Sequence, residues 1–241
     1  MKAVVVTGHR GAVGAAVASA LAAEGYEVIG IDRQAAEGAD DIAIDFATLG
    51  DTAVRQCLGE ALEARLEGRH CIALINNAAV QRLGSLDSLT PDDFLESQVV
   101  NVFAPLLLSK LLLPHLKRAG GQILNIGSIH AKQTKPGFVS YATSKGALAT
   151  LSRALAVDIG EHVRVNTISP AAIDTEMLRA GFKHAPELLE TLKQYHPTRS
   201  IGSPVEVASL IVALLRGEFS FLNGAEIDLT GGIGARLHDP A

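Results

Sequence analysis

The chain has few cysteines and no block of basic residues. Its 241 residues include two cysteines, Cys57 and Cys71, which form no CxxC pair and have no histidine neighbours at metal-ligand spacing. We therefore expect two reduced, buried thiols in a cytoplasmic protein, and no metal site. The net charge of -5 at pH 7 comes without a basic cluster, which excludes a surface that tracks the phosphates of a nucleic acid.

Long apolar runs, internal repeats and linkers are also missing. The most apolar stretch, 106–116, is interrupted by Lys110, Pro114 and His115 and is too short to span a bilayer. A glycine turn follows soon after the first apolar residues, so we expect no secretory segment. A hydrophobic fraction of 48% with 20% charged residues is typical of a globular protein without a membrane partner.

Short runs rich in valine and isoleucine alternate with longer segments of helical period. The runs are almost continuously apolar, as expected when helices cover both faces of a parallel sheet. This pattern predicts an α/β fold, a doubly wound, seven-stranded, Rossmann-like parallel sheet in a single domain. The seven expected strands are 3–6, 27–31, 42–44, 71–75, 122–126, 163–166 and 225–229.

The segments between the runs carry helix signals. Apolar spacing predicts helices over 11–24, 51–66, 139–159 and 204–215, the last of them capped by Ser203.

A further helix is predicted to begin after Thr90, which can cap it, with Pro91 in its first turn. We expect it to run to about residue 116 and to bend near Pro105 or Pro114. The segment 174–200 breaks the strand–helix rhythm and predicts a partly helical lid over the site.

A glycine-rich turn follows the first expected strand, where residues 7–14 read TGHRGAVG. Glycines permit a tight turn and let backbone N–H groups approach a pyrophosphate at a helix N-terminus. The turn therefore predicts a dinucleotide site formed by Gly8, Arg10, Val13 and Gly14. A plain strand–helix turn is the alternative.

Asp32 ends the second expected strand. A carboxylate there can accept both ribose hydroxyls of an adenosine and would repel a 2′-phosphate, which favours NAD over NADP. The neighbouring His9, Arg10 and Arg33 could partly neutralise that repulsion or could be solvated residues at a loop rim.

Several further segments resemble the short-chain dehydrogenase/reductase family over essentially the whole chain. The family motif TGxxxGxG is matched by Thr7, Gly8 and Gly14, with Ala12 at its middle glycine. Residues 76–79 (NNAA) resemble the family's NNAG, and 169–175 (SPAAIDT) resemble its PGxxxT segment. The resemblance implies further cofactor contacts from Asp45, Phe46, Asn77, Ala78, Pro170, Ile173 and Thr175.

Tyr141 and Lys145 match the YxxxK motif of the family, and their spacing places them on one face of a helix. A phenol has a pKa near 10, and a nearby ammonium favours the phenolate, so we expect Lys145 to lower the pKa of Tyr141. The resemblance implies that Tyr141 is the acid/base and that Lys145 also binds the nicotinamide ribose. A surface pair is the alternative interpretation.

Two other residues complete the catalytic set that the resemblance implies. Ser128 follows the fifth expected strand, where its hydroxyl can hold a substrate oxygen. Asn101 lies inside the expected long helix, where asparagine is mildly unfavourable, and in the family it supports a water through which protons leave. Such residues are otherwise a strand-end cap and an exposed helical side chain.

Gln81 and His130 are expected on the substrate side of the nicotinamide. Hydroxybutyrate dehydrogenases of the family place Gln and His at similar positions to hold a carboxylate, but Phe138 stands here where they use lysine. A hydroxy acid and a neutral alcohol, sugar or ketone are both open as substrates. His130 could also act as a second acid or base, or both residues could bind water at the rim.

The resemblance implies an NAD(P)-dependent oxidoreductase acting on CH–OH groups. A non-catalytic dinucleotide sensor is an alternative on the same fold, although all four catalytic positions are filled. Epimerases and dehydratases of the wider family generally carry an added region after the sheet, and few residues follow the last expected strand. Apolar helices around 106–113 and 147–157 favour a homo-oligomer, a dimer or homotetramer, over deep burial in a monomer.

Overall fold

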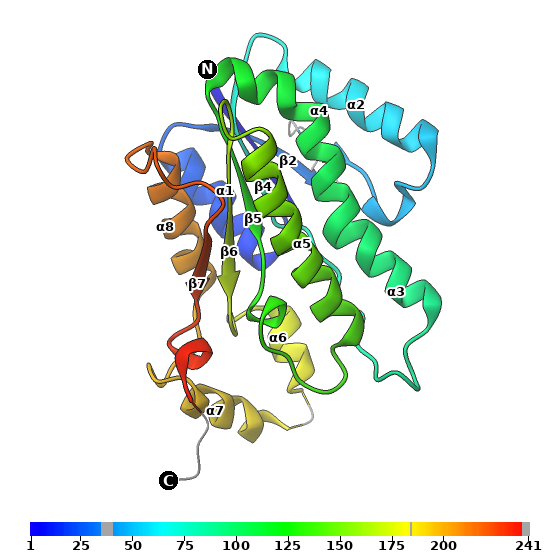
Figure 1. Ribbon diagram of the computed structural model, residues 1–241, viewed down its shortest axis with the longest axis vertical. Helices are drawn as coiled ribbons and strands as arrows, with labels where there is room; N and C mark the ends of the chain where they lie inside the picture. The colour runs from blue at the N-terminus through cyan, green and yellow to red at the C-terminus, as the bar shows by residue number, and fades with distance from the viewer. Residues whose placement is uncertain (35–40, 184, 238–241) are drawn as a thin grey trace.

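The computed structural model describes residues 1–34, 41–183 and 185–237. Seven parallel strands form one sheet in the order β3-β2-β1-β4-β5-β6-β7, which confirms the predicted doubly wound α/β architecture (Figure 1). The strands are β1 Lys2–Thr7, β2 Glu27–Asp32, β3 Ile42–Ala43, β4 His70–Asn76, β5 Gln122–Ile126, β6 Arg164–Pro170 and β7 Glu226–Leu229.

The sheet is buried on both faces because successive residues of each strand enter different cores. In β1, Ala3 and Val5 belong to one hydrophobic cluster, whereas Val4 and Val6 belong to the other. The first cluster contains side chains of α2 Thr52–Leu66, α4 Ala104–Ala119 and α5 Val139–Asp158. The second contains those of α1 Ala12–Ala23 and α8 Pro204–Leu215.

Most helix boundaries follow from local capping. Ser203 and Glu206 form a reciprocal capping box at α8, as the serine cap predicted. Thr90 accepts a hydrogen bond from Asp93 N–H at 3.1 Å and begins α3 Pro91–Gln98. The segment 174–200 contains two short helices, α6 Glu176–Gly181 and α7 Pro186–Tyr195, beyond the carboxyl ends of the strands (Figure 1).

The long helix predicted from Thr90 is interrupted by a π-helical turn, Val99–Phe103, before α4 begins. Pro105 explains this place, since it has no N–H to offer the carbonyl four residues earlier. Pro114 lies inside α4, which continues to Ala119, five turns of chain beyond neither proline being a stop. The expected end near residue 116 was therefore short.

The continuous helical stretch Pro91–Ala119 is long and apolar enough, by length and composition, to cross a membrane. The expectation that no segment reaches that length was wrong, because it considered only 106–116. Leu108, Leu112 and Leu116 of this stretch are fully buried in the core against the sheet. That packing is typical of a core helix of a globular fold.

Two other expectations need correction. The sixth strand extends to Pro170 rather than 166, because its polar residues Thr167 and Ser169 are buried in the middle of the sheet. Cys57 is exposed on α2, not buried, whereas Cys71 is buried and burial raises the pKa of its thiol to about 12. Helix α2 turns Leu58, Leu62 and Leu66 toward the core, and Cys57 lies outside that stripe.

Gly30 in β2 generates a prediction about stability. A methyl group there would lie 2.6 Å from the His9 ring and from Asp41 Oδ1, and His9 and Asp41 are themselves bonded at 2.8 Å. We expect Gly30→Ala to lower the free energy of unfolding by about 1–3 kcal/mol through overpacking. Urea denaturation measures it. The double variant with His9→Ala should recover part of the loss, and an unchanged midpoint in Gly30→Ala would contradict the prediction.

Candidate active site

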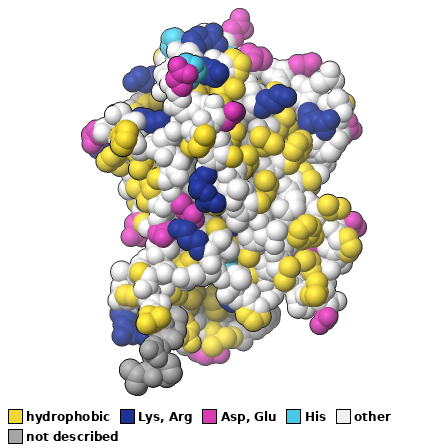
Figure 2. All heavy atoms as spheres, viewed as in Figure 1, with side chains coloured by type: hydrophobic (Ala, Val, Ile, Leu, Met, Phe, Trp, Pro, Cys, Tyr) yellow, Lys and Arg dark blue, Asp and Glu magenta, His cyan; other side chains and the backbone are white. Residues whose placement is uncertain are grey.

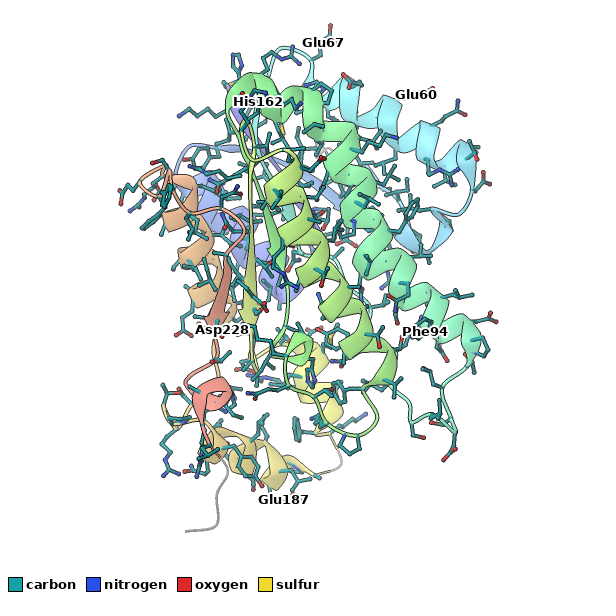
Figure 3. All side chains as sticks on the ribbon, in the orientation of Figure 1. Glu60, Glu67, Phe94, His162, Glu187 and Asp228 are labelled. Atoms are coloured by element: carbon teal, nitrogen blue, oxygen red, sulfur yellow. The ribbon has the colours of Figure 1, made fainter. Side chains whose placement is uncertain are left out.

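The candidate residues gather at the carboxyl edge of the sheet. Asp32 ends β2, Asn76 ends β4 and Pro170 ends β6, while Ser128 follows β5 and caps the short 3-10 helix η3 Ile129–Ala131. Because all strands are parallel, these ends lie at one side of the molecule, the side of α6 and α7 (Figure 1). In Figure 3, Glu187 of α7 marks this side, and Glu67 and His162 mark the opposite one.

The phosphate turn connects β1 to α1. Gly8 has a left-handed backbone with φ 61°, and a Cβ there would lie 2.9 Å from Ala78 Cα. A Cβ at Gly14 would meet the Gly8 carbonyl oxygen, so both glycines are required by packing. Ala12, which replaces the family's middle glycine, is exposed, and its methyl group therefore does not crowd the turn.

Thr7 joins this turn to the loop after β4. Its hydroxyl oxygen accepts hydrogen bonds from the N–H groups of Asn77 and Ala78, both at 2.9 Å. The Asn77 amide in turn donates to the carbonyls of Thr7 and Gly8 at 3.0 and 3.1 Å. Sequence reasoning identified Asn77 and Ala78 as cofactor residues but gave no role to Thr7, which anchors them.

Asp32 is held in place by backbone donors. One carboxylate oxygen accepts the N–H of Arg33 at 2.7 Å, and the other accepts the N–H of Arg10 at 3.2 Å. The Arg10 and Arg33 residues are themselves exposed. The acid is therefore fixed beside the phosphate turn.

The remaining expected cofactor residues lie around the same edge with different exposures. Asp45 caps the 3-10 turn η1 Phe46–Thr48, and the Phe46 ring is buried in the core, so only its backbone faces a nucleotide. Ile173 is 9% exposed and pairs with Gly202, and the Thr175 hydroxyl caps α6. Val13 is half-buried in the first turn of α1.

These residues fit a nicotinamide dinucleotide. The N-terminus of α1, which follows the turn directly, has no side-chain cap at Gly11, so its first N–H groups are free of a side-chain acceptor. Uncapped helix donors beside a glycine turn are suited to a pyrophosphate. The fixed carboxylate of Asp32 is suited to ribose hydroxyls.

Tyr141 and Lys145 lie one turn apart on α5. The Tyr141 and Ser128 side chains are hydrogen-bonded, and Lys145 Nζ lies 5.7 Å from the centroid of the Tyr141 ring. Lys145 is 2% exposed and donates to the carbonyl of Ile126 in β5 at 2.7 Å. The structure therefore brings Ser128, Tyr141 and Lys145 together at the end of β5.

The electrostatics of this group differ from the expectation. Burial raises the pKa of the Tyr141 hydroxyl above 10, and the hydrogen bond with Ser128 offsets only part of that. The expectation that Lys145 lowers the pKa of Tyr141 was wrong for this structure, because the ammonium is turned to the Ile126 carbonyl. Burial also lowers the pKa of Lys145 from 10.5 to about 8.

Asn101 lies in the π-helical turn and is 1% exposed. Its amide pairs with both backbone groups of Val80, at 2.9 Å each, and donates to the Ser144 hydroxyl at 2.9 Å. Ser144 then donates to the carbonyl of Tyr141 at 2.8 Å. Sequence reasoning missed Ser144, whose only signal was its place inside the YxxxK motif.

The two substrate-side candidates lie on different loops. Gln81 is half-buried directly after Val80, which Asn101 holds. The His130 ring is stacked on Phe138 with centroids 4.3 Å apart and lies edge-on to Tyr141 at 5.8 Å. Burial and the nearby Lys135 lower the pKa of His130 to about 4, so this ring is neutral at pH 7 and does not titrate there as an acid or base.

The buried Lys145 yields a prediction on pH and stability. Its pKa is about 8 when folded and near 10.5 when unfolded, so between these values the unfolded chain binds more protons and stability rises with pH. Relative to Lys145→Met, the wild-type free energy of unfolding should rise by about 3 kcal/mol from pH 7.5 to 10.5. Denaturation at several pH values measures the difference. Parallel curves for the two proteins would count against it.

Comparison with known proteins agrees with this geometry. A family model described as enoyl-(acyl carrier protein) reductase matches residues 8–234. L-fucose dehydrogenase from Oryctolagus cuniculus is 33% identical, over 96% of this chain and 84% of that protein. Meso-2,3-butanediol dehydrogenase from Serratia marcescens is 31% identical, over 99% and 97%.

Similar relations hold for a protein without an enzymatic name and for a solved structure. Protein FixR from Bradyrhizobium diazoefficiens is 34% identical, over 96% of this chain and 86% of that protein. The aldohexose dehydrogenase of Thermoplasma acidophilum superposes with a TM-score of 0.91 at 26% identity, covering 100% of this chain and 96% of that one. With its ordered site and these matches, the chain belongs to the short-chain dehydrogenase/reductase family of oxidoreductases.

Proposed function

We propose that this protein transfers a hydride between a nicotinamide dinucleotide and a small alcohol or carbonyl compound, with Tyr141 as acid/base. The observation that carries the proposal is the Ser128–Tyr141–Lys145 group, which lies at the same sheet edge as the phosphate turn and Asp32. Relatives that bear the names of fucose, butanediol and aldohexose dehydrogenases support a CH–OH substrate.

The dinucleotide, when bound, supplies the hydride donor or acceptor, and the chain supplies position and proton. Ser128 Oγ accepts the N–H of His130 at 3.2 Å and bonds Tyr141, so its hydroxyl is oriented to hold a substrate oxygen. Tyr141 keeps its proton at neutral pH and can give it to a carbonyl oxygen. In the reverse direction it receives the proton of the alcohol.

Lys145 and Asn101 serve this step from behind. Lys145 remains mostly protonated at pH 7, and its place one turn from Tyr141 lets it bind the nicotinamide ribose and stabilise a tyrosinate. Asn101 fixes Val80 and, through Ser144, the carbonyl of Tyr141. We assign it the family role of supporting a water through which the proton leaves.

Two further features belong to the proposal. The segment 174–200 is positioned as a lid, and α6 is stiffened by the double hydrogen bond between Arg179 and Asp174. A homo-oligomer, dimer or tetramer, is favoured by exposed apolar side chains on and before α3, α4 and α5, where hydrophobic atoms gather on the visible face (Figure 2). They are Leu83, Leu86, Leu95, Leu106, Val139 and Val157.

Tyr141→Phe separates catalysis from cofactor binding. Screening sugars, diols, hydroxy acids and ketones with NAD(H) and NADP(H) should yield a substrate, and the variant should lose about 10³-fold or more in kcat because the proton donor is gone. NADH affinity, measured by fluorescence, should change less than about threefold. A variant as active as the wild type would refute the role of Tyr141, and cofactor binding without any turnover would favour a non-catalytic sensor.

Asp32→Ala tests the proposed preference for NAD. Removing a carboxylate that repels a 2′-phosphate should raise kcat/KM with NADP relative to NAD by about tenfold or more. The Asp45→Ala variant serves as a control, since that acid caps η1 at the neighbouring strand end. An unchanged cofactor ratio in Asp32→Ala would overturn the assignment.

A further inference from the structure

A wall of three rings flanks the proposed proton donor. His130 stacks on Phe138 with an interplanar angle of 9°, and both rings meet Tyr141 nearly at right angles, at 5.8 and 6.3 Å. All three residues are half-buried, so part of each ring remains accessible. A substrate whose oxygen reaches Tyr141 therefore has this wall as a neighbour.

The polar atoms of the wall carry no net charge at neutral pH. His130 Nδ1 is bonded to the Thr134 hydroxyl at 3.1 Å. Burial and Lys135 keep the imidazole neutral, with its pKa near 4. A neutral imidazole can exchange a hydrogen bond with a hydroxyl group, but it gives a carboxylate no opposite charge.

The cations on the surrounding loops are engaged elsewhere. Lys132, next to η3, lies 2.9 Å from Asp228 and 3.5 Å from Glu226, so two acids accompany one base there. Figure 3 labels Asp228 on β7. Lys135 lies over the Phe138 ring, 4.7 Å from its centroid.

The loop that carries Gln81 is fixed against the wall. Gly84 pairs with Phe138, and its N–H donates to the carbonyl of Gly137 at 2.8 Å. Arg82 of this loop is turned to Glu96, with two hydrogen bonds of 2.6 and 2.7 Å. Gln81 thus brings a neutral amide, not a cation, toward the substrate side.

We propose that the stacked His130–Phe138 pair is a specificity-determining wall that selects an uncharged hydroxyl or carbonyl compound over a hydroxy acid or keto acid. The rings offer flat apolar contact to the C–H groups of a sugar, diol or cyclic alcohol. The unbalanced acids at Lys132 disfavour an anion. This inference rests on the proposed function and narrows its substrate class.

Matched pairs of compounds test the inference. An aldose is compared with the uronic acid of the same configuration, and a 1,2-diol with the corresponding 2-hydroxy acid, in turnover and in calorimetric binding to the NADH-loaded protein. We expect the neutral member to be favoured by about tenfold or more in kcat/KM and in affinity. An acid that binds or reacts better than its neutral partner would overturn the inference.

Variants of Phe138 locate the effect. Phe138→Lys places a cation beside Tyr141 and should shift the neutral-to-acid ratio by about tenfold toward the acid. Phe138→Leu, the uncharged control, should weaken neutral substrates while leaving acids disfavoured. Thermal unfolding confirms that both variants fold. An unchanged ratio in Phe138→Lys, when folded, counts against the wall as the determinant.

Lys183, after α6, provides the opposing arm. If a carboxylate is recognised there, Lys183→Ala will lose acid turnover selectively, and the wall does not set the substrate class. We expect both members of each pair to be affected equally. A protein that binds NADH but neither binds nor turns over any neutral compound would overturn the inference, whereas a protein that binds neither NADH nor NADPH would overturn the proposed function itself.

Discussion

The site depends on one buried cation, Lys145, and its hydrogen bond to the carbonyl of Ile126. An ammonium taken out of water is costly unless it is paired, and here a backbone dipole at the end of β5 is the printed partner. The bond joins α5 to the strand that leads to Ser128. The spacing between Tyr141, Ser128 and the sheet edge follows from this contact.

Polar contacts in the interior reinforce the same helix. The Asn76 amide donates to Asn125 at 2.7 Å, Asn125 donates to Ser152 at 2.7 Å, and Ser152 donates back to the carbonyl of Leu148. This chain crosses from β4 through β5 to α5. Together with Asn101 and Ser144 it fixes α5 against two strands and the loop after β4, and a fully bonded polar network of this kind favours one arrangement of the core.

Much of the fold could be predicted from the sequence, because the strands are continuously apolar and the helices carry clear caps such as Ser203 and Thr90. The end of β6 could not, since Thr167 and Ser169 have the composition of a loop and are buried only by tertiary packing. The local pattern likewise gives no sign that Cys57 lies off the buried stripe of α2 or that Pro105 is accompanied by a π turn.

For the site, sequence reasoning identified residues but not their environment. Tyr141, Lys145, Ser128 and Asn101 were identified by motif, and the structure gathers them at one edge. The direction of the Tyr141 pKa was not predictable, because it depends on where Lys145 points and on how much water remains around the phenol. The neutral state of His130 depends in the same way on its stacking with Phe138, a contact between separate turns of the chain.

The π turn at Val99–Phe103 contains one residue more than an α-helix would need for the same stretch. Shortening this stretch by a single residue would restore regular winding, and α3 would then rotate by about 100° relative to α4. Asn101 would leave Val80, and the apolar stripe that α4 presents to β4 would no longer be in phase with α3. Chain length at this point is therefore constrained more tightly than residue identity, so in homologous sequences gaps should avoid residues 99–103 even where the side chains vary.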